Sequence, residues 1–578
     1  MTSTAGRGSP MRGSAAAILL VGLTLAGCRR ADHPVVNTST SASDNGGGDA
    51  PAGVSGPTSG PPSRDAMTLT IRLNPAAVWD DGQPITSTDL ACTWRAQLNT
   101  PGSSMVGWND DIRSIDSTDP HVAIVHFSSR VASYKTLFSR IIRHDAVKSC
   151  DDISRDFQSS IPFSGRPWKQ QLWSQTFAQL VPNPRYWQPD AIPSASSATF
   201  FPKQGLQNEI DALSSGEVSL ILPQDAPGLE DSLAHPGVAT APAPQVNYES
   251  LYFQQKTGPF SDPVFRHAFS SAVDRDFILK SVYAPISPGG ALLECGLWVP
   301  TMGPWCDQSA FVNSYDPDRA AQLLTGAGWK RGADGFWADP SGSVPTIRWV
   351  VNSGNRRREE MQQLLIPRLA TLGFKVVADN ADSDSVFQQR LPDLDYDLAT
   401  VVRATSPDPS VTAFMSCDAV GSPGSSATGQ NLTGWCSTDA TQLMKQSDAE
   451  LDDAARLSEI RRIGQYLVDD AVLLPLYQFS NVLAWRTDAI GGPVAVDAAN
   501  YRSAFNTMNE WMPLGGAGLT FAAESWPVCL NPVTDCADAL WSLWSNIFPV
   551  LPNVWDTTAD GTFVPTALVV GEPMVTTG

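Results

Sequence analysis

Basic residues are scarce in this chain of 578 residues. Lysine and arginine together number 39, against 59 aspartates and glutamates, so the formal net charge at pH 7 is -20 and the isoelectric point is about 4.6. A protein that binds nucleic acid or an anionic membrane surface through charge needs a basic face, and this composition argues against both partners. With 42% hydrophobic and 17% charged residues the chain is of globular composition, and its length predicts about two or three lobes.

Catalytic signatures are also missing. The sequence contains no GxSxG nucleophile motif, no phosphate-binding P-loop and no HExxH metal motif. The segment GAGWKRG (residues 326–332) loosely resembles a glycine-rich phosphate loop, but it follows a predicted helix instead of a strand, which favours a helix C-cap. Carboxylates are numerous, yet no spacing singles out a pair like that of glycosidases. We therefore predict that the protein is not an enzyme and has no cofactor.

A metal site is not expected either. His121 and His126 stand five positions apart in a strand pattern, so their side chains point to opposite faces of the strand. No two cysteines have CxxC spacing, and the six histidines do not cluster near the cysteines.

The one long apolar run lies at the N-terminus. Arg7 and Arg12 precede SAAAILLVGLTLAGC (residues 14–28), whose apolar stretch is too short to span a bilayer and is typical of a signal-peptide core. Its end, LAGC, resembles the bacterial lipobox, which implies that residues 1–28 are a lipoprotein signal peptide and that Cys28 is acylated. A soluble protein with a chance apolar run is the alternative.

A segment of low apolar content follows the expected anchor. Residues 29–62 are rich in Ser, Gly and Pro and contain almost no large apolar side chain, so they cannot bury enough surface to offset chain entropy. We expect a flexible tether there. The protein would then lie outside the cytoplasm at the outer face of the cell membrane, and its lipid anchor would be its only contact with the membrane.

Cysteine usage fits export. Of the nine cysteines the anchor would use Cys28, which leaves an even number for disulfides. Their spacing suggests three local pairs and, by elimination, a fourth: Cys295 with Cys306, Cys417 with Cys436, Cys529 with Cys536, and Cys92 with Cys150.

Hydrophobic periodicity predicts a mixed α/β protein. Residues 67–74 alternate apolar and polar side chains, as a half-buried strand does. The pattern predicts a strand at 345–351, a helix at 355–373 and a strand at 374–379, which form a βαβ unit with a crossover. Helices are also expected after Asp262-Pro263 and after Asp316-Pro317, where the aspartate can cap the first turn.

Three segments together resemble one known family. LTIRLNPAAVWDDGQPITSTDL (69–90), GPFSDPVFRHAFSSAVDRDFIL (258–279) and YDPDRAAQLLTGAGW (315–329) resemble motifs of the family 5 extracellular solute-binding proteins, the peptide and nickel receptors of ABC importers. The motifs consist of turns, caps and core faces, so they identify a scaffold and not a ligand. The resemblance implies the bilobal type II periplasmic-binding-protein fold, in its large family 5 variant with an extra subdomain, and mixed sheets flanked by helices.

The resemblance also implies a domain layout. Residues 63–250 would form lobe I with the extra subdomain, 251–490 the ligand-closing lobe II, and 491–578 would return to lobe I. Within the last part, residues 517–578 resemble the segment with which chains of this family usually begin, so we interpret the order of segments as circularly permuted. Residues 567–573 would then pair with residues 68–74. A C-terminal extension of similar appearance is the alternative.

Ligand-binding candidates are carried over by position from the family. They lie in the loop at 524–532, in the segment RATSPDPS and beside Cys436: Trp526, Asn531, Arg403, Thr405, Asp408 and Trp435. In peptide receptors of the family an aspartate at the position of Thr405 holds the α-ammonium group of the ligand. Its absence here puts simple amine anchoring in doubt.

Other residues could take over that role. Asp408 could substitute for the aspartate, or Arg403 could hold a carboxylate or phosphate of the ligand. Each tryptophan could equally be a packed core ring, and Asp408 could be a turn residue.

The predicted function is that of a monomeric, lipid-anchored substrate-binding receptor of an ABC importer. It would capture an oligopeptide or a similar small polar solute between its lobes and deliver it to permease subunits. A non-transport regulatory or scaffold lipoprotein of the cell envelope on the same fold is the alternative. An exported carbohydrate-active enzyme is a third reading.

Overall fold

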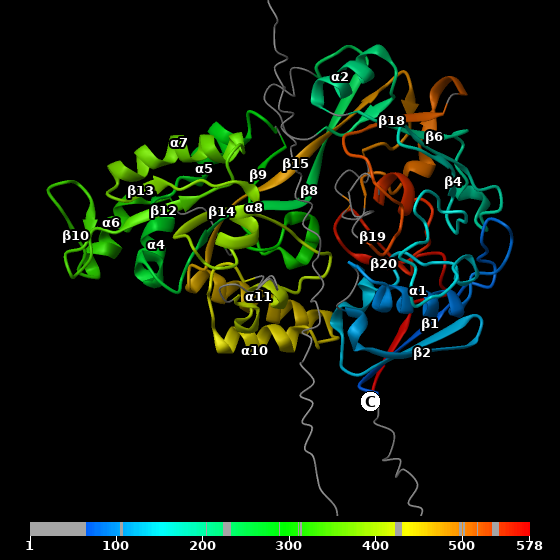
Figure 1. Cartoon of the computed structure of the whole chain (residues 1–578), viewed down its shortest axis with the longest axis horizontal. Helices are drawn as coiled ribbons and strands as arrows, with labels where there is room; N and C mark the ends of the chain where they lie inside the picture. The colour runs from blue at the N-terminus through cyan, green and yellow to red at the C-terminus, as the bar shows by residue number, and fades with distance from the viewer. Residues whose placement is uncertain are drawn as a thin grey trace, which may run out of the picture.

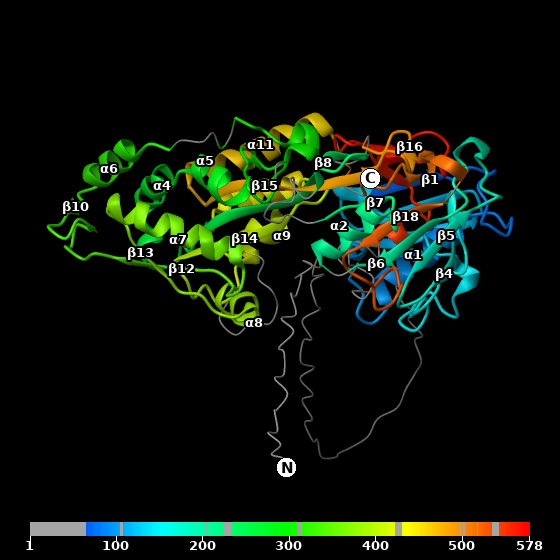
Figure 2. The same cartoon turned by 90° about the horizontal axis from the view of Figure 1, so that it is seen from above.

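The protein consists of two lobes that two long strands connect. Lobe I contains the cores that extend from Met67 to Ala243 and from Val482 to Val569, and lobe II contains the cores that extend from Tyr248 to Tyr477. Lobe II lies on the left and lobe I on the right of Figure 1, and Figure 2 gives the view from above. The computed structural model describes residues 65–104, 108–203, 205–223, 233–287, 289–309, 311, 315–421, 431–495, 500, 503–516, 518–534 and 543–578.

The connecting strands are β8 (Val238–Phe253) and β15 (Leu473–Arg486). They pair antiparallel along their whole length, so one ladder of hydrogen bonds runs from the core of lobe II into the core of lobe I. The two strands therefore form the covalent and hydrogen-bonded hinge between the lobes.

The register of this pair shifts twice between Pro475 and Ser480, and shifts of this kind bend a strand. Side chains of lobe II satisfy the backbone polar groups of Ser480. The Tyr283 hydroxyl accepts from its N–H at 2.9 Å, and the Ser287 hydroxyl donates to its carbonyl at 2.5 Å. The bend thus has fixed hydrogen-bond partners.

In the part of the chain that the structure describes, an eleven-stranded sheet extends from the hinge strands into both lobes. Its further strands are β14 (Leu398–Ala404), β12 (Thr346–Val350) and β13 (Lys375–Ala378) in lobe II, β9 (Ala291–Leu292) against β15, and β7 (Leu220–Ile221), β18 (Leu519–Ala523), β6 (Ala198–Pro202), β5 (Ala178–Pro182) and β4 (Trp168–Trp173) in lobe I. β12, β13 and β14 are parallel to one another, and so are β7, β18 and β6.

A second, four-stranded sheet in lobe I has the order β2-β3-β1-β21. Its strands are β2 (Ile112–Asp119), β3 (Val122–Phe127), β1 (Met67–Arg72) and β21 (Met574–Thr577). Met67, Leu69 and Ile71 are fully buried, which confirms the predicted alternation of β1.

The C-terminal segment lies beside β1, but in a different register from the one predicted. Regular pairing joins Met67–Thr70 to Met574–Thr577. The predicted segment 567–573 meets residues 72–74 through the bridge between Leu73 and Val569 and through two backbone hydrogen bonds of 2.8 Å, from Asn74 N–H to the carbonyl of Leu568 and from Val570 N–H to the carbonyl of Arg72. The N–H of Gly578 donates to the carbonyl of Ala66 at 3.4 Å.

Helices flank the sheets of both lobes. In lobe I they are α1 (Ser87–Asn99) and α2 (Leu206–Ser215); in lobe II they are α4 (Pro263–Ala272), α5 (Arg275–Ile278), α6 (Pro317–Gly326), α7 (Arg356–Thr371), α8 (Ser383–Ser385), α9 (Thr412–Met415), α10 (Thr438–Ser447) and α11 (Asp453–Asp469). Short two-stranded pairs join β10 (Lys330–Arg331) to β11 (Trp337–Ala338), β16 (Ile490–Gly491) to β17 (Met512–Pro513) and β19 (Trp555–Thr557) to β20 (Phe563–Pro565).

The predicted helix starts are confirmed. The side chain of Asp262 accepts from Val264 N at the start of α4, and that of Asp316 accepts from Arg319 N at the start of α6. α6 ends at Gly326 and Gly328 has φ +85°, so the segment at 326–332 is a helix C-cap as predicted.

A buried ion-pair network ties α7 to the hinge. Glu249 on β8 has no exposed surface, and it accepts from Arg358 Nε at 2.6 Å, from Arg357 Nε at 3.3 Å and from the Tyr477 hydroxyl on β15. Burial by itself would raise the pKa of Glu249, but the two guanidinium groups and the hydroxyl lower it to about 2. The carboxylate therefore stays charged and holds α7 against both hinge strands.

Three of the four predicted disulfides are confirmed. Cys92–Cys150, Cys295–Cys306 and Cys417–Cys436 have Cα–Cα distances of 5.0, 4.9 and 4.6 Å. Cys529 is disulfide-bonded, and its predicted partner, Cys536, lies outside the described residues.

The predicted signal peptide, Cys28 and the tether up to residue 62 also lie outside the described residues. In the part of the chain that the structure describes, no helix combines the length and the apolar character needed to cross a membrane.

Candidate functional site

The parallel strands of each lobe end at the side that faces the other lobe. β8 runs into lobe II and β14 is antiparallel to it, so β14, β12 and β13 run back toward lobe I. β15 runs into lobe I and β7 is antiparallel to it, so β7, β18 and β6 run toward lobe II. Ligands of open α/β sheets bind outside the carboxyl ends of parallel strands, so the two sets of loops that follow these strands form the candidate site.

We call the loops of lobe I edge I and those of lobe II edge II. Edge I comprises residues 203, 205–209, 222–223 and 524–530, and edge II comprises residues 351–355, 379–382 and 405–411. Figure 1 shows the hinge strands β8 and β15 passing between these two parts of the molecule.

Trp526 and Asn531 follow β18. The Trp526 ring is half-buried, and its Nε1 donates to the carbonyl of Ser174 at 2.8 Å, which fastens edge I to the turn after β4. Asn531 has no exposed surface, and its amide donates to the carbonyls of Ile153 and Asp156 at 2.5 and 3.2 Å. Trp526 therefore lies on edge I, whereas the buried Asn531 holds the end of the loop to the backbone of Ile153 and Asp156.

Arg403 and Thr405 lie at the end of β14. Arg403 is 6% exposed, its Nε lies 3.3 Å from the Tyr252 hydroxyl, and its guanidinium lies 5.2 Å from the centroid of the Phe414 ring. The N–H and hydroxyl of Thr405 both donate to the carbonyl of Val246, at 3.0 and 3.3 Å. Thr405, the first residue of this part of edge II, is thus still hydrogen-bonded to β8, as the residues of β14 are.

Asp408 is engaged within lobe II. Both of its carboxylate oxygens pair with Arg456, at 2.7 and 2.9 Å, and Oδ1 also accepts from the N–H of Ser410 at 3.1 Å. The other aspartates of edge II have partners too, since Asp379 pairs with Arg390 and Asp382 caps α8.

Trp435 belongs to the interior of lobe II. It is 4% exposed, and its Nε1 donates to the carboxylate of Asp470 at 2.7 Å. The preceding turn is built on Asn431, whose side chain bonds to five backbone groups and one hydroxyl. This geometry agrees with the alternative interpretation, in which Trp435 is a packed core ring.

The structure thus brings Thr405 and Asp408 to edge II and Trp526 to edge I. Arg403 lies just behind edge II among aromatic rings. The ligand-binding role of all six candidates stays a prediction.

Glu209 and Glu524 are two residues of edge I that the sequence did not single out. Glu524 directly follows β18, and Glu209 lies in the first turns of α2. Glu209 is 1% exposed and its Oε2 has no hydrogen-bond partner. Burial, and then the charge of Glu524, raise the pKa of Glu209 to about 8. An acidic residue in the first turn of a helix ordinarily interacts with the helix dipole, so the sequence gives no sign of this burial.

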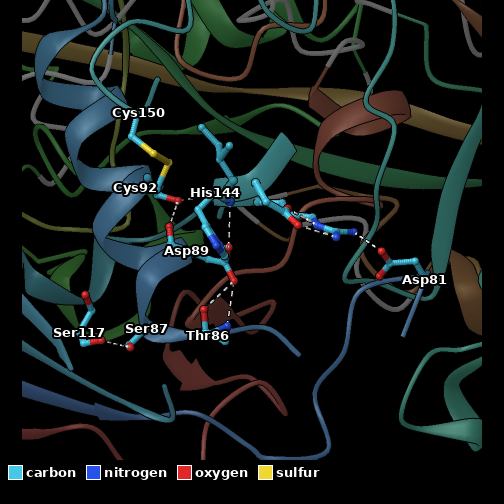
Figure 3. A network of polar contacts seen from close by, with 12 residues as sticks. Asp81, Thr86, Ser87, Asp89, Cys92, Ser117, His144 and Cys150 are labelled. Atoms are coloured by element: carbon cyan, nitrogen blue, oxygen red, sulfur yellow. Dashed lines mark hydrogen bonds and ion pairs between the residues drawn. A yellow bond between two sulfur atoms is a disulfide. The ribbon is translucent and has the colours of Figure 1, made fainter. Parts of the chain in front are cut away.

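Another polar network lies at the start of α1 (Figure 3). The buried carboxylate of Asp89 accepts from Thr86 N at 2.8 Å and His144 N at 2.9 Å, and it bonds to His144 Nδ1 at 2.6 Å. The disulfide between Cys92 and Cys150 joins the same helix to the same loop.

This network has a structural role. Aspartate–histidine pairs also occur in hydrolases, where the histidine activates a serine hydroxyl. Here the nearby Ser87 donates its hydroxyl to the carbonyls of Ser117 and Asp119, at 3.3 and 2.7 Å. Across the described ranges, no three His, Cys, Asp or Glu side chains group in a way that could hold a metal ion.

Among the residues that the structure describes, the lobes also touch in two places away from the hinge. The N–H of Ala132 in lobe I donates to the carbonyl of Asp448 in lobe II at 2.8 Å, and Lys135 lies 3.6 Å from Asp453. Leu451 of lobe II packs against the core of lobe I.

In the second place, two glycine backbones meet. A Cβ on Gly303 of lobe II would lie 2.5 Å from the carbonyl oxygen of Asp560. A Cβ on Gly561 of lobe I would lie 2.5 Å from that of Thr301. Both glycines have positive φ angles, +60° and +78°, so side chains are excluded there by space and by conformation.

Known proteins resemble this chain over most of its length. The family model for bacterial extracellular solute-binding proteins, family 5 (middle region), matches residues 58–422. The probable ABC transporter periplasmic-binding protein SapA of Escherichia coli is 21% identical over 404 residues, which are 68% of this chain and 69% of SapA. The oligopeptide-binding protein AppA of Bacillus subtilis is 20% identical over 439 residues, 72% of this chain and 76% of AppA.

A solved structure shares the fold. The periplasmic EDTA-binding protein EppA superposes with a TM-score of 0.62 at 21% identity, over 77% of this chain and 84% of EppA.

Replacement of Gly561 by alanine tests the contact between the lobes. We expect Gly561→Ala to separate the lobes and increase the radius of gyration measured by small-angle X-ray scattering, because the methyl group would meet the backbone of Thr301. Gly335→Ala is the matched control, since Gly335 has φ +84° but no atom within 4 Å of its Cβ. Both variants should lose about 1 kcal/mol of stability through backbone strain. Equal radii for the two variants would show that this contact does not hold the lobes together.

Proposed function

The chain belongs to family 5 of the bacterial extracellular solute-binding proteins, and we propose that it is the substrate-binding receptor of an ABC importer. The predicted family and fold class are thereby confirmed. We propose further that it captures an oligopeptide or a similar small polar solute between edge I and edge II and releases it to permease subunits. The observation that supports this most strongly is that the parallel strands of both lobes point their carboxyl ends at each other across the hinge.

The mechanism needs no chemical step. A ligand that touches both edges stabilises the arrangement in which the lobes are close, and the permease would recognise that arrangement. Motion between the lobes would bend β8 and β15 near the register shifts of β15, while Glu249 keeps α7 attached to the moving ladder. The family is one of receptors, and we propose that this member also lacks catalytic activity.

The names of the relatives support a peptide as the ligand class. AppA is named an oligopeptide-binding protein and SapA an ABC transporter periplasmic-binding protein. Thr405, Asp408 and Trp526 remain our candidates for contact with the ligand, because they lie on the two facing edges. Arg403 stands behind edge II, and we keep it as a candidate anion site.

Native mass spectrometry of residues 61–578 tests the proposed function. We expect a bound mass that is lost on denaturation, together with an upward thermal shift when a pool of short peptides is added. A scaffold without a ligand site would show neither, and that result would favour the regulatory or scaffold lipoprotein. A pool of oligosaccharides serves as the control ligand, and its hydrolysis would favour the carbohydrate-active enzyme.

We also propose that the protein is a lipoprotein anchored through Cys28. The apolar run that ends in LAGC and the tether at 29–62 support this, and the extracytoplasmic location of the relatives agrees with it. We expect Cys28→Ser to move the protein from the membrane fraction to the soluble extracytoplasmic fraction. Retention of the variant in the membrane fraction would contradict the proposal.

We further propose that the segments of this chain are circularly permuted relative to the family. β18 supplies a central strand of the lobe I sheet, and β21 lies beside β1. A chain in which residues 517–578 precede residue 65 tests this order. Domains tolerate a rearrangement of this kind where their chain ends lie close together. We expect the rearranged chain to have the same circular dichroism spectrum and a melting temperature within a few degrees; failure to fold would favour a C-terminal extension.

A further inference from the structure

The loop at 405–411, part of edge II, is held by two buried interactions with other parts of lobe II. Asp408 pairs through both carboxylate oxygens with Arg456 on α11, at 2.7 and 2.9 Å, and both residues are 4% exposed. The carbonyl of Pro409 accepts from Trp298 Nε1 at 2.9 Å, and Trp298 is 3% exposed. Loss of either interaction would leave a buried polar group unsatisfied, so we expect the loop to move together with these two side chains.

Arg456 leads from the loop to the first of the two contacts between the lobes. Its Nε donates to the carbonyl of Ser447 at 2.9 Å, and the carbonyl of the next residue, Asp448, accepts from the N–H of Ala132 in lobe I at 2.8 Å. Leu451, in the same connection between α10 and α11, packs against the core of lobe I. Figure 1 shows α10 and α11 at the border with lobe I. We call this the helix contact.

Trp298 leads from the loop to the second contact. It lies in the segment that the disulfide between Cys295 and Cys306 closes. The same segment contains Gly303, where a Cβ would lie 2.5 Å from the carbonyl oxygen of Asp560 in lobe I. We call this the glycine contact. The ring that holds the loop at 405–411 and the backbone that touches lobe I thus belong to one short closed segment.

We propose that the loop at 405–411 couples the helix contact to the glycine contact, with Arg456 and Trp298 as its positioning residues. Opening one contact shifts the loop, and the shift weakens the support of the other, so the two contacts form and break together. A ligand that displaces this loop would alter both contacts at once. The inference goes beyond the proposed function and does not depend on it, because it concerns contacts within the chain.

Hydrogen–deuterium exchange of the Ala132 amide measures the helix contact, because this N–H is bonded to lobe II. Rigid lobes alone would also link the two contacts, since the loss of one lets the lobes part. The test is therefore made in Gly561→Ala, where we expect the glycine contact to be broken. In this background, with the full chain in detergent, Trp298→Phe should speed exchange of the Ala132 amide about tenfold, because the Pro409 carbonyl loses its donor.

Trp337→Phe in the same background is the matched control. Trp337 is 7% exposed and its Nε1 donates to the carbonyl of Leu372 at 2.9 Å, so the substitution removes the same kind of bond from lobe II. The residue lies on β11, whose partner β10 is at the end of lobe II that is far from lobe I in Figure 1. Trp337→Phe should change the exchange of the Ala132 amide by less than about twofold.

Two results would contradict the proposal. No further change on Trp298→Phe would show that the contacts are linked only by rigid lobes, and equal acceleration by both tryptophan variants would show a general loss of stability. The receptor function stands in either case, because no ligand is involved.

If Trp298→Phe does not fold, Asp408→Asn in the Gly561→Ala background decides. It should speed exchange of the Met302 amide, which donates to the carbonyl of Val299 at 2.8 Å within the disulfide-closed segment. With the glycine contact broken, only the loop at 405–411 would transmit this effect, so unchanged exchange would overturn the proposal.

Discussion

The antiparallel pairing of β8 with β15 is the constraint on which the rest of the structure depends. These two strands connect the cores of the lobes, and every strand of the large sheet takes its direction from one of them. Because they run in opposite directions, the parallel strands that flank them point their carboxyl ends at each other. The position of the candidate site is thus a consequence of strand direction, and it does not depend on any single side chain.

Two buried glutamates of this protein show how neighbouring groups set the pKa of a buried carboxyl group. Glu249 has two guanidinium groups and a hydroxyl around it, and its pKa falls to about 2. Glu209 is buried almost as completely, lacks a partner for one oxygen and has Glu524 as a neighbour, and its pKa rises to about 8. The first residue stabilises the hinge, whereas burial of the second without a partner for Oε2 costs free energy.

Much of the fold could be predicted from local sequence. The alternation of β1, the aspartate caps of α4 and α6, the C-cap after α6 and two disulfides follow from residues that are close in sequence, and the structure confirms them. The third confirmed disulfide, Cys92–Cys150, was obtained by elimination. The register of β21 against β1 could not be predicted, because apolar residues at 567–570 and at 574–575 fit a strand equally well and only the packing of lobe I decides between them.

The candidate site was harder to predict, because its side chains contact residues that are distant in sequence. Asp408 meets Arg456, which follows 48 positions later, and Asn531 meets carbonyl groups of a segment 375 to 378 positions earlier. The loops that the family resemblance singled out lie at the ends of β14 and β18. Whether a side chain in such a loop faces a ligand or the protein interior depends on partners that no local pattern reveals.

The distribution of the two lobes along the chain sets an order for folding. The cores of lobe II come from one continuous stretch, whereas lobe I needs both β1 and β21, in which Thr68 meets Thr576 across 508 positions. Contacts between distant residues form slowly, because a long loop must close before they stabilise anything. A chain that emerges amino end first therefore completes lobe II while the open edges of lobe I are still unpaired. Those edges are the part of the nascent protein that is most exposed to aggregation and most dependent on a chaperone.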